Sequence, residues 1–530
     1  MTELSRRTFI AGTAATALAA PALAPAQAPK KGGTLRFVPI GDLKILDPIW
    51  TTAYITRDHG YMIYDTLFAN DASLQPRPQM VDKYTVSRDR MKWMFTLRGG
   101  LRFHDGQPVT AEDCVASLVR WGKRDALGRM LMAATAKLQA SDKKTFVLEL
   151  KSPFGIVLEA LAKPSSNVPF IMPARLAATP DTEQVKEAIG SGPFKLVKEE
   201  WQPGHQVVYA RNADYVPRSE PASGAAGGKV VYLDRVVWRY QPDPATASAA
   251  MENGELDYWW LPTADYVARM EKNPNIQVFV SDPTGIQGWL RPNHLHPPFD
   301  NKKARQALLY LMDQELWLQA AIGQPKYYRT CPSFFMCGNM PYESKAGAPA
   351  RPDLERAKQL LKEGGYDGRS LILLDPTDRP EMHGACLVLR EQLQRIGARV
   401  ELASHDWSTV IAKRAERKPP AAGGWNLMHA TWISPDVNNP AVNIGLSGAC
   451  DKAWFGWSCS EQMEKLRGDW LKASDAGERR KLAEQVQVLA YDEVPYVPWG
   501  QYLAPSLYRK QVKGVLNFPA AVLWNVWLDT

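Results

Sequence analysis

The sequence predicts a mixed α/β fold, and two observations carry that prediction. Short runs with the two-residue alternation of β-strands are interspersed with longer runs that have the helical period of about 3.6 residues. The two kinds of run alternate along the chain, which is typical of mixed α/β proteins and not of all-helical or all-β ones. At about 150 residues per domain, the 530 residues correspond to about three to four domain-sized units.

The individual elements follow from local signals. Strands are predicted at residues 34–38, 92–97, 145–150 and 399–402. Helices are predicted at residues 111–121, 300–316, 354–362 and 386–396. Thr110 and Asp113 form a capping box at the start of the first helix, and Asp300 is expected to cap the second. The third helix ends at Gly364-Gly365 and the fourth at Gly397.

The composition excludes several classes of protein. Hydrophobic residues make up 45% and charged residues 23%, which rules out a disordered chain and a polytopic membrane protein. The formal net charge of +8 over 530 residues is too small to predict a nucleic-acid partner. The chain contains 18 Trp, 19 Tyr and 15 Phe. Most are expected in the core, and a surplus of Trp also suits a protein that encloses a small organic ligand.

The first residues have the pattern of an export signal. Ser5-Arg6-Arg7-Thr8-Phe9-Ile10 is a twin-arginine motif, and a short apolar run follows at residues 11–20. Small-residue cleavage triplets occur at residues 22–24, 24–26 and 26–28. We favour cleavage after Ala26, because the other two sites would place a proline directly after the cut. The sequence therefore predicts a signal peptide at residues 1–26 and a periplasmic protein without a stable membrane anchor.

Six cysteines fit an oxidising compartment. Cys331 lies close to Cys337, and Cys450 lies close to Cys459; neither spacing is that of a zinc ribbon. We therefore predict two local disulfides, Cys331–Cys337 and Cys450–Cys459. Cys114 and Cys386 occur in helical patterns among apolar neighbours and are expected to be buried free thiols.

The sequence lacks the common motifs of catalysis and of cofactor binding. The sequence has no G-x-S-x-G nucleophile elbow, no H-E-x-x-H zinc motif and no G-x-G-x-x-G after a strand. No pair of Asp or Glu residues is singled out for acid–base work, and the eight His residues do not cluster. The sequence therefore predicts a protein that is not an enzyme, with no cofactor and no metal site.

Several motifs together resemble one protein family. The segment 103–113, F-H-D-G-Q-P-V-T-A-E-D, closely resembles the F-x-D-G-x-P-V-T-A-x-D signature of the peptide/nickel/oligopeptide solute-binding proteins of ABC importers (family 5). Further similar segments occur in the family's order at residues 46–48, 64–68, 190–194, 212–215, 254–257, 298–308 and 475–480. Each motif alone is weak, but eight in the right order cover the whole mature chain.

This resemblance implies a two-lobed type II periplasmic-binding-protein fold. Lobe I would comprise residues 27–68, 189–283 and 503–530, with an extra subdomain inserted at residues 69–188. Lobe II would comprise residues 284–502. Two crossovers, near Asp282-Pro283 and over residues 496–502, would form the hinge between the lobes. Closure of such a hinge over a ligand buries it and turns occupancy into a change of shape.

The same resemblance implies the function. The protein is expected to be a monomer that captures a small peptide or peptide-like zwitterion and delivers it to the membrane permease of an ABC importer. Two alternatives remain open at this stage. One is a binder of nickel or a metallophore within the same family, and the other is an exported hydrolase of a different class.

The family's ligand-binding segments point to a set of site residues. The segment after Leu46-Asp47-Pro48 offers backbone to the ligand in such proteins, which here gives Thr52 and Tyr54. In the second lobe, Trp407, Arg414 and Trp432 occupy the places of the family's Trp, basic residue and W-x-x-D motif. Basic groups would meet a ligand carboxylate, and an acid would meet an ammonium. The complete set of expected ligand-binding residues is Thr52, Tyr54, Trp407, Arg414, Trp425, His429, Trp432, Asp436 and Trp499.

Two of these residues depart from the family pattern. Asp436 lies one residue later than the usual acid, with Pro435 in the usual position. His429 stands where some oligopeptide binders have a second arginine. Asp436 would bind the ammonium, with a turn residue beside Pro435 as the alternative. Arg414 and His429 would bind the carboxylate, and Trp407, Trp425 and Trp432 would stack on the ligand body, with core packing as their alternative role.

Overall fold

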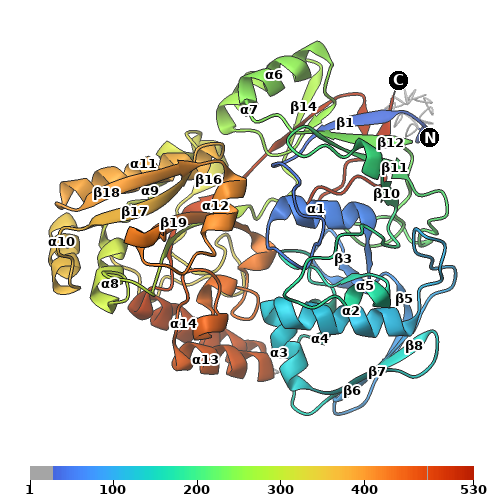
Figure 1. Cartoon of the computed structure of the whole chain (residues 1–530), viewed down its shortest axis with the longest axis horizontal. Helices are drawn as coiled ribbons and strands as arrows, with labels where there is room; N and C mark the ends of the chain where they lie inside the picture. Colours follow the sequence, from blue (N-terminus) through green and yellow to red (C-terminus); the bar gives the residue numbers. More distant parts are fainter. Residues whose placement is uncertain (1–27, 474, 530) are drawn as a thin grey trace, which may run out of the picture.

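The computed structural model describes residues 28–473 and 475–529, and it has two lobes (Figure 1). Lobe I contains the first and last strands of the chain, and lobe II is formed by residues 286–502. The predicted signal peptide lies outside the described residues. No helix in the described part of the chain is both long and apolar enough to cross a lipid bilayer.

Lobe I is built on a seven-stranded mixed sheet. The central strand β1 (Thr34–Val38) matches its predicted bounds and is parallel to both of its neighbours. Along the sheet the strands are β10 (Phe194–Leu196), β11 (Gln206–Arg211), β12 (Arg235–Arg239), β1, β13 (Tyr258–Trp259), β21 (Ser506–Arg509) and β14 (Ile276–Phe279). Its helices are α1 (Tyr54–Ile63), α6 (Pro244–Asn253) and α7 (Ala264–Met270).

A smaller unit is inserted in lobe I between β1 and β10. Its four-stranded antiparallel sheet consists of β5 (Val81–Val86), β6 (Lys92–Leu97), β8 (Thr145–Leu150) and β7 (Thr135–Ala140), in that order. Its helices are α2 (Ala111–Arg124), α3 (Ala126–Ala134), α4 (Val157–Leu161) and α5 (Ala174–Ala177). The predicted capping box is present, because Thr110 and Asp113 each accept a hydrogen bond from the other's backbone N–H. Short strand pairs, β2 (Asp65–Thr66) with β9 (Phe170–Ile171) and β3 (Phe68–Asn70) with β4 (Pro76–Pro78), accompany it.

The signature segment joins this insertion to lobe I. The backbone N–H of His104 donates to Gly190 O at 2.8 Å, and Gly192 N donates to Ile63 O at 2.8 Å. A Cβ on Gly192 would lie within 2.7 Å of the backbone of Ile63, so the close approach requires glycine there. The two motifs that resemble the family most clearly therefore hold parts of the lobe together and lie outside the cleft described below.

Lobe II is built on a six-stranded sheet. Its strands are, in order, β16 (Tyr328–Arg329), β20 (Val497–Tyr502), β15 (Ile286–Pro292), β19 (Leu427–Ile433), β17 (Ser370–Pro376) and β18 (Arg399–His405). Its helices are α8 (Lys302–Tyr310), α9 (Gln314–Ala321), α10 (Leu354–Glu363), α11 (Pro380–Arg395), α12 (Trp407–Lys413), α13 (Glu461–Lys472) and α14 (Ala476–Glu493). Every residue of β15 and β20 is buried, as expected for strands in the middle of a covered sheet.

One helix prediction is wrong and one is too short. The run predicted as a single helix at residues 300–316 is two helices, α8 and α9. Asn301 caps α8 in place of Asp300, and Asp313 starts α9 by accepting a hydrogen bond from Leu316 N. The helix predicted from Cys386 begins earlier, at Pro380, where the fixed φ of proline suits a first turn.

Two chain segments connect the lobes. The first runs between β14 and β15 and includes Asp282-Pro283 as predicted. The second was predicted over residues 496–502, but most of that range is β20, whose hydrogen bonds belong to the sheet of lobe II. The connection itself is the short stretch 503–505 between β20 and β21. The last strand thus returns to lobe I, where both ends of the described chain lie (Figure 1).

The cysteines are arranged as predicted. Cys331 is joined to Cys337 and Cys450 to Cys459, and each disulfide closes a short loop in lobe II. Cys114 and Cys386 are buried free thiols. Burial raises the pKa of both thiols, so neither is a reactive thiolate.

Candidate functional site

The largest cavity along the boundary of the lobes measures about 730 Å³ and has walls from both lobes. Lobe I contributes the segment before α1 and residues of α2 and α3, and lobe II contributes α12 and the loop at residues 451–457. This volume lies in the usual range for small-molecule sites. A smaller cavity of about 40 Å³ adjoins it and shares Thr52, Ile55 and Arg414 with it.

The segment before α1 is held rigidly by buried polar contacts. Asp47 forms a buried ion pair with Arg120 of α2. The side-chain amide of Asn167 donates to the backbone oxygens of Ile49 at 2.8 Å and Thr51 at 2.9 Å. These bonds fix the course of the chain just before it presents Thr52 and Tyr54 to the cleft.

Arg414 is a buried cation that has no carboxylate partner within the described part of the chain. It follows the last turn of α12, is 5% exposed, and donates from Nη2 to the Thr52 hydroxyl at 3.1 Å. Its Nε has no hydrogen-bond partner among the described residues. The guanidinium lies 4.8 Å from the ring centroid of Phe455 and 5.5 Å from that of Trp454. Burial lowers the pKa of Arg414 to about 10, so it remains protonated at neutral pH.

Asp436 joins the lobes through three hydroxyl groups. Its carboxylate is 1% exposed and accepts hydrogen bonds from Tyr54 Oη at 2.8 Å, Ser165 Oγ at 2.8 Å and Ser166 Oγ at 3.0 Å. All three donors belong to lobe I, whereas Asp436 ends the turn after β19 in lobe II. Burial raises the pKa of Asp436, and the nearby charge of Lys163 opposes that shift.

Two cations support these serine hydroxyls from behind. Arg57 Nη1 donates to Ser165 Oγ at 2.9 Å, and Lys163 Nζ donates to Ser166 Oγ at 3.2 Å. Since the oxygen of each serine accepts from a cation, its hydroxyl hydrogen is directed to Asp436. Ser166 has a φ of 46°, in the left-handed region that non-glycine residues rarely occupy. We call Asp436, Tyr54, Ser165 and Ser166 the interlobe latch.

Two tryptophans lie beside this latch. Trp432 meets Tyr54 edge to face, with ring centroids 6.3 Å apart, and Trp407 lies 6.0 Å from the Arg414 guanidinium. Both line the smaller cavity together with Thr52. The structure therefore brings together five of the predicted ligand-binding residues around one cavity: Thr52, Tyr54, Trp407, Arg414 and Trp432.

The structure places three other predicted residues in the interior of lobe II. His429 lies between Trp317 and Trp499, with ring centroids 5.5 Å and 6.4 Å away, and Trp425 packs on Trp457. In the described structure none of Trp425, His429 and Trp499 lines the cavities above. Side chains alternate along β19, so His429 and Trp432 face opposite sides of the sheet. Burial lowers the pKa of His429 to about 3, which leaves it uncharged at neutral pH.

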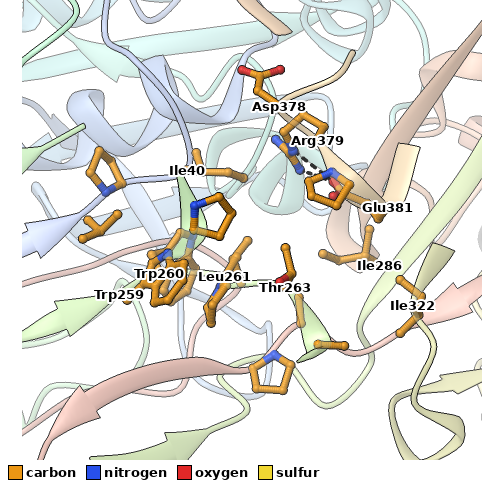
Figure 2. Close-up of a pocket in the computed structure, with 18 of the residues that line it drawn as sticks. Ile40, Trp259, Trp260, Leu261, Thr263, Ile286, Ile322, Asp378, Arg379 and Glu381 are labelled. Carbon is orange, nitrogen blue, oxygen red and sulfur yellow. Dashed lines mark hydrogen bonds and ion pairs between the residues drawn. The ribbon is translucent and has the colours of Figure 1, made fainter. Parts of the chain in front are cut away.

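A further cavity of about 130 Å³ lies beside the two connections between the lobes (Figure 2). Trp259, Trp260 and Leu261 form one wall, and Ile286 and Ile322 form the other. At its edge Arg379 and Glu381 form a hydrogen-bonded ion pair. This cavity shares Ile40 and Arg379 with the small cavity beside Trp407, so the three cavities follow one another along the boundary of the lobes.

Within residues 28–473 and 475–529, no group of three His, Cys, Asp or Glu side chains is placed to hold a metal ion. Of the predicted charged residues, Arg414 lines both interlobe cavities and is suited to an anionic group of an organic ligand, whereas Asp436 lines neither of them.

Residues 75–450 match the model of the bacterial extracellular solute-binding proteins, family 5. The chain belongs to this family. A probable peptide ABC transporter periplasmic-binding protein of Sinorhizobium fredii is 40% identical to this family 5 protein over 533 residues, which cover 99% of each chain. The glutathione-binding protein GsiB of Salmonella typhimurium is 25% identical over 484 residues, covering 89% of this chain and 90% of its own.

Solved structures share the fold of this family 5 protein. The periplasmic binding protein AgaA of A. tumefaciens, in complex with agropinic acid, superposes with a TM-score of 0.81 at 24% identity, covering 94% of this chain and 99% of its own. DppA of Helicobacter pylori, in complex with a peptide, has a TM-score of 0.80 at 22% identity, with the same coverage. These likenesses confirm the two-lobed type II fold that the motifs predict.

Several residues of the site were not predicted from the sequence. Ser165 and Ser166 lie 271 and 270 residues from Asp436, and no motif marks them. Arg124 and Arg129 line the large cavity but are ordinary basic residues of helical segments in the sequence. No sequence signal could have found these four residues, because their role depends on how the insertion is placed against lobe II.

Proposed function

We propose that this protein captures a small peptide or peptide-like zwitterion between its lobes and delivers it to the membrane permease of an ABC importer, as a periplasmic monomer. Its family is one of solute-binding proteins, and the relative from S. fredii bears the name of a peptide transporter component. Structures with the same fold hold a peptide or agropinic acid. These relationships support the class of ligand, and the cleft supports the way in which the ligand is held.

The observation that carries the proposal is the buried, unpaired guanidinium of Arg414. A buried cation is normally paired with an anion, and Arg414 instead has only the neutral hydroxyl of Thr52 and three aromatic rings. A ligand carboxylate would complete this site with charge-assisted hydrogen bonds from Nε and Nη. Trp407 and Trp432 would then lie beside the body of the ligand.

The ligand's ammonium belongs at Asp436 in this proposal. An ionised carboxylate has about four acceptor positions, of which the three hydroxyls of the interlobe latch occupy three. An ammonium can take the remaining position or replace a serine hydroxyl. Because the latch already joins the lobes, a ligand that also contacts both lobes favours the closed form and shifts the population towards it.

The experiment is a thermal-shift screen with dipeptides and tripeptides, followed by titration calorimetry. A ligand that binds only the folded protein raises its stability by about 2.7 kcal/mol at a hundredfold excess over Kd. Arg414→Gln should weaken a hit by about tenfold to hundredfold, since hydrogen bonds to charged groups contribute about 1.5–3 kcal/mol. Arg395→Gln, an exposed arginine of α11 paired with Glu391, is the control for the change in charge. Hits bound equally by Arg414→Gln and wild type would contradict the proposal.

A further inference from the structure

Arg414 is one of three arginines that line the large cavity without a carboxylate partner. Arg124 ends α2 and Arg129 lies in α3, so both come from the insertion in lobe I. Arg124 donates to the backbone oxygens of Trp50 at 2.7 Å and Asp181 at 3.1 Å. Among the described residues, none of the three guanidinium groups takes part in an ion pair within 4.0 Å.

Arg129 contacts both Arg124 and the facing wall of lobe II. Its Nη1 donates to the backbone oxygen of Arg124 at 2.9 Å, and its Nη2 donates to that of Lys452, in lobe II, at 3.3 Å. Arg124 and Arg129 are therefore neighbours on one wall, half-buried, and bound only to neutral acceptors. Burial lowers the pKa of both arginines, yet an arginine remains protonated at neutral pH. Within the described residues neither arginine forms an ion pair, and the nearest carboxylates act on them only through space: Asp181 and Asp47 on Arg124, and Asp125 and Glu464 on Arg129.

The remaining charges of the cavity do not neutralise this wall. The cavity is also lined by Lys44, Lys123, Lys452, Asp42, Asp181 and Asp451. Asp451 is ion-paired with Arg417, which is not part of the lining, and Asp42 lies 3.9 Å from Lys44. The lining thus has more basic than acidic groups, and its field attracts an anion.

We propose that the ligand is a small acidic peptide or peptide-like solute with at least two carboxylates and a net negative charge. One carboxylate pairs with Arg414 in lobe II, and a second pairs with Arg124 and Arg129 in lobe I. The planar fork of a guanidinium matches a carboxylate with two parallel hydrogen bonds. Asp436 has a single carboxylate and pairs with one ammonium, so a ligand with two carboxylates and that one ammonium has a net negative charge. This inference rests on the proposed function and adds the charge of the ligand to it.

The test compares peptides that differ in charge, with Glu and Gln as the isosteric pair. Trialanine peptides carrying Glu, Gln or Lys at each of the three positions are titrated into the wild-type protein. At the best position the Glu peptide should bind roughly tenfold or more tightly than its Gln counterpart, and the Lys peptide should bind more weakly than both. The preference should shrink as salt is added, because exposed parts of the site are screened.

Variants then assign the preference to the two arginines. The double variant Arg124→Gln, Arg129→Gln should bind the Glu and Gln peptides with equal affinity. Arg395→Gln should keep the full preference. The ratio of affinities is the readout, because a purely structural loss would weaken both peptides alike. Arg124→Lys keeps the positive charge and should keep part of the preference for the Glu peptide. This variant provides the test if the double variant does not fold.

The outcomes separate this inference from the proposed function. If peptides bind but Glu and Gln forms bind equally in the wild type, the acidic ligand is excluded while peptide capture stands. If the double variant keeps the wild-type preference, Arg124 and Arg129 are not the second carboxylate site. If inorganic phosphate displaces the Glu peptide with comparable affinity, the site is a general anion site and the assignment to carboxylates fails. If no peptide of the series binds, both the proposed function and this inference are overturned.

Discussion

At the scale of single residues, the two buried charges at the boundary of the lobes have opposite surroundings. Asp436 is buried and is satisfied by Tyr54, Ser165 and Ser166, whereas Arg414 is buried and has no counter-charge. A buried ion without a partner is costly for a folded protein. An unpaired buried charge at the edge of an interlobe cavity is typical of a binding site, because a ligand can supply the opposite charge.

Asp436→Ala should weaken an amine-bearing ligand by about two to three decades. Removal of one partner leaves the ammonium buried and unpaired, which costs on the order of 3–5 kcal/mol, at about 1.4 kcal/mol per decade. Titration calorimetry with a peptide and with its N-acetylated form gives the comparison. The acetylated form should be nearly insensitive to the substitution. Equal affinity of the free-amine peptide for the variant and the wild type would assign Asp436 to the latch alone.

His429→Phe should reduce the acid sensitivity of the protein without changing ligand affinity. Burial lowers the pKa of His429 to about 3 in the folded protein, whereas an unfolded histidine has a pKa of about 6.5. The unfolded state therefore binds the proton first. Above about pH 6.5 the histidine is neutral in both states and does not reduce the free energy of unfolding. As the pH falls from about 6.5 towards 3, protonation of the unfolded state progressively lowers that free energy.

Urea unfolding at pH 5 and pH 7 measures this effect as a change in the free energy of unfolding. At pH 5 the loss is about 2 kcal/mol relative to pH 7, since one pKa unit corresponds to about 1.36 kcal/mol. The Phe variant should lack this share of the loss, while His59, also buried and with a pKa lowered to about 3, contributes equally in both proteins. An identical loss in both proteins would show that His429 titrates normally in the fold.

At the scale of elements, the sequence predicted the correct bounds for three strands in which apolar and polar residues alternate clearly. Residues 34–38, 92–97 and 145–150 became β1, β6 and β8 without a shift. The prediction of one helix at residues 300–316 was wrong because the apolar period continues across the break between α8 and α9. Leu316 fits the period but is 43% exposed in α9, which starts anew at its own cap. Periodicity reports which residues are apolar, and the cap decides where a helix starts.

Gly288→Ala should destabilise lobe II, by about 1–3 kcal/mol, the usual cost of overpacking. Gly288 lies in β15 in the middle of the sheet, where an added Cβ would overlap the ring of Trp499. Gly468→Ala is the matched control, because nothing lies within 4 Å of its Cβ position in α13. The control should be more stable than wild type by about 0.5–1 kcal/mol. Urea unfolding of both variants checks the prediction, and similar values for the two would contradict it.

At the scale of the whole molecule, the latch is a set of contacts that an opening of the lobes would break. Tyr54, Ser165 and Ser166 belong to lobe I and Asp436 belongs to lobe II. A second set lies between the insertion and α13, where Gly155 N donates to Leu471 O at 3.0 Å. Two short connections join the lobes, so hinge motion is limited mainly by such contacts.

The double variant Ser165→Ala, Ser166→Ala should shift the ligand-free protein towards an open form. It removes two of the three hydrogen bonds to a buried carboxylate, and an unsatisfied buried group costs about 1–3 kcal/mol. Opening lets water satisfy Asp436 and relieves that cost. Interlobe fluorescence energy transfer and small-angle scattering should report a larger separation. Ser408→Ala, which removes an exposed interlobe hydrogen bond from Lys44, is the control and should leave the separation unchanged.

Export of the whole protein is predicted from its first residues, which lie outside the described structure. The variant Arg6→Lys, Arg7→Lys should accumulate as unprocessed precursor in the cytoplasm, because the twin-arginine route requires both arginines. Fractionation followed by N-terminal sequencing gives both the location and the cleavage site. Normal periplasmic accumulation of the variant would assign export to another route.

The sequence by itself determined the α/β class, the family, the two disulfides and five residues around the cleft. Each of these depends on local information, namely residue period, motif order or short spacing along the chain. Thr52, Tyr54, Trp407, Arg414 and Trp432 were found because they lie within such motifs. Motif position does not report on which side of a strand a residue faces, so His429 of β19 was included with them.

Tertiary structure decided the rest. The hydroxyls that bind Asp436 come from a segment about half the chain away, and Arg124 and Arg129 reach the cavity only because the insertion packs against lobe II. Contacts between residues so distant in sequence leave no periodic or compositional trace in one chain. The neutral state of His429 likewise follows from burial between Trp317 and Trp499, which desolvates its charged form. Long-range packing, which a single sequence does not encode locally, therefore brought the arginines to the cavity, and desolvation set the charge state of the buried histidine.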